Sequence, residues 1–103
     1  MKYDVIRTTR FKRDYKRVQK RGEDMELLRI VVDLLRQGEP LPAKYQDHAL
    51  AGNYKGSREC HVKPDWLLIY RIEKSVLVLT LMRTGTHGDL FAREDGVLYG
   101  ERG

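Results

Sequence analysis

The sequence predicts an α+β fold, in which two N-terminal helices pack on one face of an antiparallel sheet of about four strands. Two observations lead to this prediction. Apolar residues recur every three or four positions between residues 9 and 37, as on one side of a helix, and every second position between residues 57 and 83, as in strands. The helices are therefore grouped, and the predicted order β-α-α-β-β-β is typical of this class.

A short strand is predicted over residues 2–7, followed by a helix over residues 9–21. The apolar stripe of that helix consists of Phe11, Tyr15 and Val18. Thr8 or Thr9 can cap its start, and a glycine follows its end.

A second helix is predicted over residues 24–37, and Gly38 ends it. With one or two residues between them, the two helices should form an antiparallel hairpin. The core stripe of the second helix is formed by Met25, Leu28, Val32 and Leu35 and is widened by Leu27, Val31 and Leu34.

Residues 39–56, which include two prolines, are predicted to form a long loop, and a loop of this length in a small domain is often functional. Three strands follow over residues 57–63, 66–72 and 76–83, joined by short turns into a meander. We expect one domain over residues 1–91 and a polar, glycine-rich tail over residues 92–103.

Composition excludes several classes of protein. The chain has 103 residues, one cysteine and no apolar run near the roughly 20 residues needed to span a bilayer. Its first ten residues lack the apolar segment of a secretory signal, so we expect a cytoplasmic protein with no membrane partner. The single Cys60 excludes an internal disulfide and zinc sites built on several cysteines, and we interpret it as a buried apolar residue.

Positive charge is concentrated at the N-terminus. The net charge is +5, but residues 1–22 hold nine Lys/Arg and two Asp, a net charge of +7, and the remaining 81 residues carry −2. This asymmetry indicates a polyanionic or acidic partner, although a solvated helix face would show the same pattern. The basic side of the first helix is formed by Lys12, Arg13, Lys16, Arg17, Lys20 and Arg21.

The second half of the chain carries a set of residues suited to acid–base chemistry: His48, His61, Asp65, Arg83 and His87. Imidazoles exchange protons near neutral pH, and a guanidinium matches phosphate oxygens, so the set fits metal-free attack on a phosphodiester. Taken singly, each histidine could equally be a surface or core residue, Asp65 a turn residue, and Arg83 an ion-pair partner.

No cofactor and no metal site are predicted. The histidines are separated by 13 and 26 residues, which matches no short metal-binding motif. Trp66 could belong to the core or could offer a face on which a base stacks.

Several segments together resemble the YafQ branch of the RelE superfamily, the toxins of bacterial type II toxin–antitoxin pairs. These segments are DHAL at 47–50, GNYKGSRECHVKPDW at 52–66, LLIYRI at 67–72 and RTGTHGDLF at 83–91. With the N-terminal strand and helices, the resemblance covers residues 1–91 and implies a RelE-like fold.

The resemblance implies a ribosome-dependent endoribonuclease that cuts mRNA in the ribosomal A site through attack by the ribose 2′-OH. It implies catalytic roles for the five residues named above, with His87 as the acid, Arg83 on the phosphate, and Asp65, His48 or His61 as the base. Trp66 and Phe91 also match active-site positions, and Lys55 and Arg58 lie in the matched segments as further substrate-binding candidates.

The basic helix would then contact ribosomal RNA, and a cognate antitoxin would mask the site. Operator DNA would be contacted only indirectly, through the antitoxin. Two alternatives remain: a toxin of the same fold that acts by binding, for example on gyrase, and a basic RNA- or protein-binding module.

Overall fold

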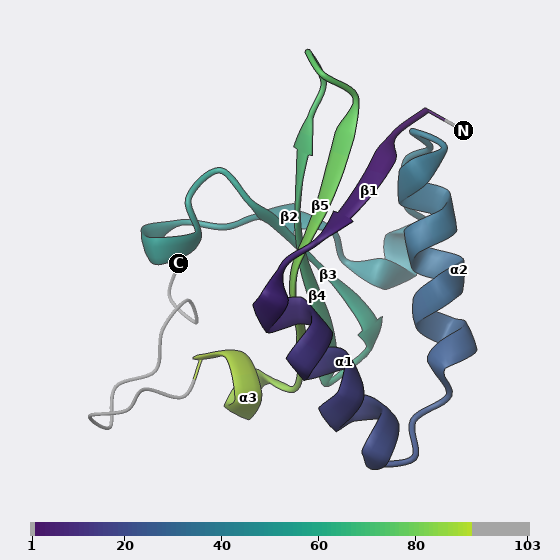
Figure 1. Ribbon diagram of the computed structural model, residues 1–103, viewed down its shortest axis with the longest axis vertical. Coiled ribbons are helices and arrows are strands. Elements are labelled where there is room, and N and C mark those ends of the chain that lie inside the picture. The colour runs from purple at the N-terminus through teal and green to yellow at the C-terminus, as the bar shows by residue number, and fades with distance from the viewer. Residues whose placement is uncertain (1, 92–103) are drawn as a thin grey trace.

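The structure is a computed structural model that describes residues 2–91; the tail predicted over residues 92–103 lies outside the described residues. It consists of one sheet with two helices on one face and a short third helix near the other (Figure 1). The strands are β1 (Asp4–Arg7), β2 (His48–Ala49), β3 (Arg58–Lys63), β4 (Trp66–Glu73) and β5 (Val78–Gly85). The helices are α1 (Thr9–Lys20), α2 (Met25–Arg36) and α3 (His87–Phe91).

The α+β class and the order of the main elements are confirmed, but the sheet differs from the prediction in two ways. It has five strands in the order β1-β5-β4-β3-β2, and it is mixed, because β1 pairs in parallel with β5. Alternation of side chains identifies a strand but carries no information about the direction of its neighbour, so the parallel pair had no signal in the sequence.

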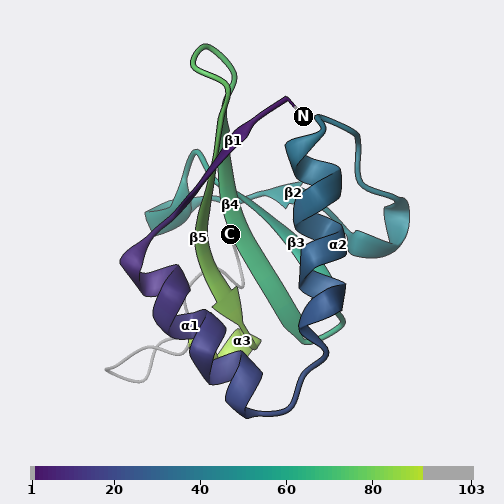
Figure 2. The same cartoon turned by 45° about the vertical axis from the view of Figure 1, so that its right-hand side comes forward.

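The two long helices begin and end close to the predicted positions. The Thr8 side chain accepts a hydrogen bond from the Phe11 backbone N–H and caps α1, and Asp24 caps α2 in the same way. Gly22 follows α1 with φ +88°, a conformation that favours glycine. In Figures 1 and 2 the two helices form a hairpin against the sheet.

The main core lies between these helices and the sheet. Phe11 and Val18 from α1 and Leu28, Val31 and Leu35 from α2 are buried there, against apolar side chains of β3, β4 and β5. A second, smaller core lies on the opposite face of the sheet. It is formed by Leu50, Leu67, Ile69, Leu90 and Phe91, with Tyr54 and Met82 packed against it.

The predicted loop over residues 39–56 contains more structure than expected. Two 3₁₀ turns, Ala43–Tyr45 and Gly52–Tyr54, flank β2, whose two residues pair with Glu59 and Arg58 of β3. A two-residue strand is too short for alternation to reveal it, whereas its pairing fixes His48 beside β3.

An irregularity in the pairing of β4 with β5 positions Arg83. Tyr70 pairs with Leu81 and Ile69 pairs with Arg83, so Met82 is an extra residue on β5. This bulge brings Arg83 into register with Ile69, which belongs to the second core. Among residues 2–91, no helix has the length and apolar character needed to cross a membrane.

Candidate active site

The three predicted histidines lie together at one end of the sheet. His48 comes from β2, His61 from β3, and His87 begins α3. The ring centroids of His48 and His61 are 6.4 Å apart, and those of His61 and His87 are 5.9 Å apart. Residues separated by 39 positions in the sequence therefore form one row of imidazoles with His61 in the middle.

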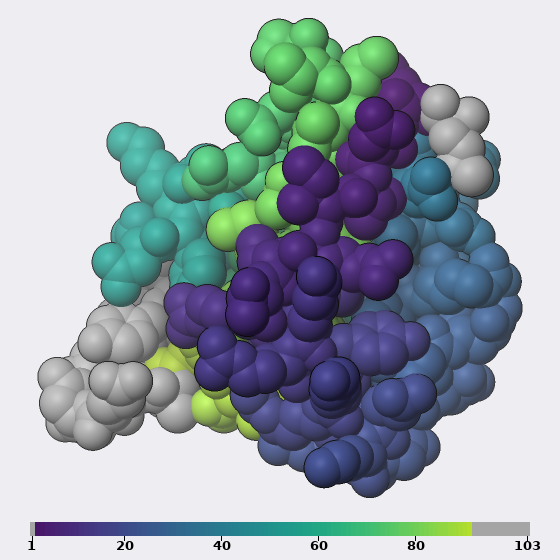
Figure 3. All heavy atoms as spheres, in the orientation of Figure 1, coloured from purple at the N-terminus to yellow at the C-terminus, as the bar shows by residue number. Residues whose placement is uncertain are grey.

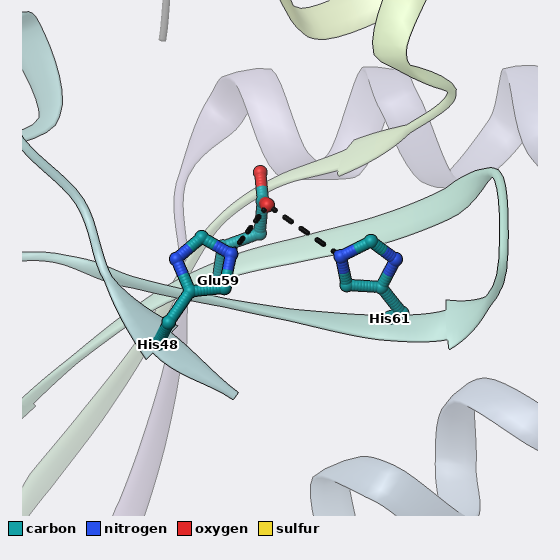
Figure 4. Close-up of side chains that lie close together, drawn as sticks. All are labelled: His48, Glu59 and His61. Atoms are coloured by element: carbon teal, nitrogen blue, oxygen red, sulfur yellow. Dashed lines mark hydrogen bonds and ion pairs between the residues drawn. The ribbon is translucent and has the colours of Figure 1, made fainter. Parts of the chain in front are cut away.

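Glu59, which the sequence analysis did not identify, lies between two of these rings (Figure 4). Its Oε1 is 3.0 Å from His48 Nε2 and 3.8 Å from His61 Nε2. The residue is 5% exposed, and its Oε2 has no hydrogen-bond partner among the described residues. Its position two residues before His61 on a strand places both side chains on one face, and this spacing was the signal available in the sequence.

The backbone fixes which nitrogen of His61 is available to a substrate. His61 Nδ1 is 3.2 Å from the Pro64 carbonyl oxygen, which can only accept a hydrogen bond. In the neutral ring Nδ1 therefore carries the proton and Nε2 has the free lone pair.

Asp65 holds His87 by two contacts. Its Oδ1 lies 2.6 Å from His87 Nδ1 and accepts a hydrogen bond of 2.9 Å from the His87 backbone N–H. These hydrogen bonds, the backbone one first, keep the pKa of Asp65 below its ordinary value. Asp65 is thus a carboxylate that orients His87 and leaves Nε2 of that ring facing outward for a substrate.

Arg83 is buried and paired with an aspartate that the sequence analysis did not single out. Its Nε and Nη2 donate to the Asp14 carboxylate of α1, at 2.7 and 2.9 Å. These hydrogen bonds raise the pKa of Arg83, and the neighbouring Tyr54 adds to the effect. Asp14 takes two of the five guanidinium N–H groups, so both N–H groups of Nη1 and one of Nη2 remain, and Asp14 decides where they point.

Phe91 connects α3 to the second core. Its ring contacts Tyr54 edge to face, with centroids 6.0 Å apart, and lies 6.5 Å from the ring of His87. Because Phe91 is 4% exposed, it supports His87 from behind rather than forming an open surface. Lys55 follows Tyr54 directly and is exposed. Its role in substrate binding stays a prediction.

Two of the residues predicted to bind substrate do not face this site. Trp66 is buried in the main core, where its indole N–H donates to Thr84 Oγ1 at 2.9 Å, and this places it away from a substrate surface. Arg58 lies on the other side of β3 from Glu59, because strand residues alternate, and it pairs with Asp47.

The six basic residues predicted to contact ribosomal RNA are all on α1 or at its end, but they do not share one environment. Arg17 and Arg21 form ion pairs with Asp89 of α3. Lys12 and Lys16 line a groove of about 500 Å³ between α1 and α2, whose floor includes Phe11, Tyr15 and Val32. Figure 3 shows α1 lying open on one face of the molecule.

One set of side chains could hold a metal ion. A nitrogen from each of His48 and His61 and an oxygen of Glu59 all lie within 4.8 Å of one another. Two imidazoles and a carboxylate suit zinc or copper. Spacing along the sequence did not reveal this set, because one of its ligands is a glutamate on the strand that carries His61.

Comparisons with known proteins agree on one family. Residues 3–92 match the model of the YafQ bacterial toxin of type II toxin–antitoxin systems. The mRNA interferase toxin YafQ of Escherichia coli K12 is 44% identical over 89 residues, which are 85% of this chain and 95% of the relative.

Solved structures give the same result. YafQ in the crystal structure of the E. coli DinJ–YafQ complex is 43% identical, with a TM-score of 0.79 over 86% of this chain and 98% of that one. A metal-bound toxin from Helicobacter pylori is 44% identical, with a TM-score of 0.81 over 86% of this chain and 99% of the toxin.

Proposed function

Since this chain belongs to the YafQ family of bacterial type II toxins, as its family match and its relatives show, we propose that it cleaves mRNA in the A site of the ribosome. At the coarser level it is an mRNA interferase toxin with a cognate antitoxin, as the E. coli relative and its complex with DinJ indicate.

The row of three imidazoles, with one carboxylate between the first two rings and another beside the third, carries the proposal. Glu59 contacts His48 and lies near His61, while Asp65 contacts His87. Cleavage of RNA by its own 2′-OH needs a base on one side of the phosphorus and an acid on the other, and this arrangement supplies both within one row. A toxin that acted only by binding would need no such set.

We assign the base to His61 and the acid to His87. His61 Nε2 takes the proton of the 2′-OH as that oxygen forms a bond to phosphorus. The bond from phosphorus to the 5′-oxygen breaks, and protonated His87 gives its Nε2 proton to that oxygen. The products are a 2′,3′-cyclic phosphate and a 5′-hydroxyl end, and the two contacts from Asp65 hold the His87 ring in position for the transfer.

Arg83 stabilises negative charge on the phosphate, and His48 lies beside it. Arg83 offers the N–H groups that its pair with Asp14 leaves free, two on Nη1 and one on Nη2. Both ring nitrogens of His48 lie near oxygens, Glu59 Oε1 at 3.0 Å and the Ala49 carbonyl at 3.2 Å, and these contacts hold the ring beside the phosphate. The Arg83 guanidinium opposes the negative charge that builds up in the transition state.

Partner binding follows from the charge distribution. Exposed lysines of α1 suit the phosphates of ribosomal RNA, which would position the toxin without reading sequence. An antitoxin with an acidic segment would complement the same basic N-terminal region and cover the site. Operator DNA would be bound by the antitoxin rather than by this chain.

The test is cleavage by the purified toxin on ribosomes programmed with a defined mRNA, mapped by primer extension. We expect discrete cuts in the A-site codon and a loss of at least about 100-fold in the His87→Gln variant, whose side chain cannot act as an acid. Phenanthroline, which binds transition metals and spares Mg²⁺, should leave the rate unchanged.

Other outcomes separate the alternatives. Cleavage of free RNA at the same rate would refute ribosome dependence, and DNA breaks that depend on gyrase would favour the binding toxin. A protein that cleaves neither RNA nor, with gyrase, DNA would favour the third alternative, a basic binding module. A His87→Gln variant with the wild-type rate would refute the assignment of the acid.

A further inference from the structure

Two ion pairs join α1 to α3, although these helices are far apart in the sequence. Arg21 binds the Asp89 carboxylate with both terminal nitrogens, Nη1 at 2.6 Å and Nη2 at 3.0 Å. Arg17 Nη1 lies 3.4 Å from the same carboxylate. The side chain of Asp89 is 13% exposed and that of Arg21 is 46% exposed, so the carboxylate is covered while the guanidinium lies at the surface.

Asp89 also fixes the first turn of α3. Its Oδ2 accepts a hydrogen bond of 2.9 Å from the Thr86 backbone N–H, and its own N–H donates to Thr86 Oγ1 at 3.0 Å. Gly85 makes room for the carboxylate, because a Cβ at that position would lie 2.8 Å from Asp89 Oδ2. The backbone leading into α3 is therefore built around this side chain.

The helix that depends on these contacts carries His87. Five residues are too few for a helix to be stable by itself, so α3 takes its position from what it is tied to. The His87 side chain is 53% exposed and is held at one side by Asp65. Leu90 and Phe91 anchor the apolar side of the helix, and Asp89 anchors the side toward α1.

We propose that Asp89, clamped by Arg21 and Arg17, is a positioning residue that sets where His87 presents its Nε2 to the RNA. The proposal rests on the function proposed above and deepens it. Asp89 touches no substrate; it acts by fixing the turn of backbone from which His87 projects. Arg17 and Arg21 then hold α3 in place through Asp89. The contacts with ribosomal RNA come from Lys12, Arg13, Lys16 and Lys20.

The experiment compares Asp89→Asn, Arg21→Gln and the double variant in single-turnover cleavage over a range of ribosome concentrations. We expect each single variant to lower the maximal rate about 10- to 100-fold, because small displacements of a catalytic group have effects of this size. The ribosome concentration at half-maximal rate should change less than about twofold. The maximal rate of the double variant should be no lower than that of the slower single variant. Arg21→Lys should recover much of the maximal rate.

Two controls give the result its meaning. Glu26→Gln removes an exposed arginine–carboxylate pair within α2, away from α3, and should change neither quantity. Lys20→Gln should raise the half-maximal concentration and leave the maximal rate unchanged. In the His87→Gln background, Asp89→Asn should cause no further loss, whereas a general structural defect would lower the remaining rate again.

The inference is overturned if Asp89→Asn keeps the wild-type maximal rate, if Arg21→Gln only raises the half-maximal concentration, or if Asp89→Asn lowers the rate further without His87. Failure of the proposed function looks different, since the wild-type toxin would then be inactive or His87→Gln would be as active as the wild type.

Discussion

The buried Asp14 carboxylate joins three groups from two elements, α1 and β5. It is 1% exposed and accepts hydrogen bonds from Arg83, from Arg17 and from the Thr84 backbone N–H. It lies beside β5 beyond Leu81, where the pairing with β1 ends. One carboxylate therefore accepts a hydrogen bond from the unpaired edge of β5 at Thr84, neutralises the buried guanidinium of Arg83 and fixes its orientation.

Asp14→Asn should destabilise the protein by about 3 kcal/mol, because it leaves the Arg83 guanidinium buried without its counter-charge. Urea denaturation at pH 7 measures the loss. Glu26→Gln, which removes an exposed pair with Arg29, should cost far less, because solvent screens that pair. Equal effects of the two variants would contradict a buried, aiming role for Asp14.

The residue types of the site could be predicted from the sequence, but their partners could not. His48, His61 and His87 lie together as expected. Asp14 and Glu59 were missed because carboxylates in a basic helix and a polar strand resemble surface residues until burial is known. For Trp66 the sequence left two alternatives, a core residue or a face for stacking a base, and its 2% exposure places it in the core.

At the scale of elements, short segments decide the site. β2 has two residues and α3 has five, and between them they carry His48 and His87. Periodicity reveals elements that repeat, so α1, α2 and the long strands were predicted to within a few residues. A two-residue strand and a single helical turn repeat nothing, and tertiary contacts determine them.

The contact that fixes α3 makes its stability depend on pH. The hydrogen bonds from Arg21 hold the pKa of Asp89 well below its ordinary value of about 3.9. A carboxylate with a lowered pKa contributes stability above the unfolded pKa and loses it as the pH falls through the folded pKa. The difference in Tm between the wild type and Asp89→Asn should thus be full at pH 6–7 and shrink below about pH 4.

Thermal unfolding followed by circular dichroism measures this difference. Arg21→Gln should show the same narrowing, since it removes the other half of the pair. A gap in Tm that stays constant from pH 7 to pH 3 would contradict the contribution of the ionised carboxylate.

For the molecule as a whole, the two faces of the sheet have different tasks. One face carries the main core under α1 and α2, and the other carries the second core and the row of histidines. Helix α1 contacts elements on both faces, because it packs on the main core and is joined to α3 through Arg17 and Arg21. Its other basic residues are the ones that we predict to contact RNA.

Charge reversal at Lys12, Lys16 and Lys20 together should weaken ribosome binding and make it less sensitive to salt. Each phosphate contact that is lost lowers the slope of log K against log salt by nearly 1. Binding measured from about 50 to 200 mM KCl tests this. Reversal of Lys74, in the turn between β4 and β5, serves as the control and should leave the slope unchanged. An unaltered slope in the triple variant would mean that α1 does not contact RNA.

The parallel pairing of β1 with β5 has a consequence for biosynthesis. Strand β1 is synthesised long before its partner β5, which begins at Val78. Arg83 and His87 are synthesised later still. A nascent chain thus holds its opening strand unpaired until nearly the whole of residues 2–91 has been translated, and contacts between such distant segments form late in folding. The sheet, and with it the row of histidines, is therefore completed only after β5 and α3 have been synthesised.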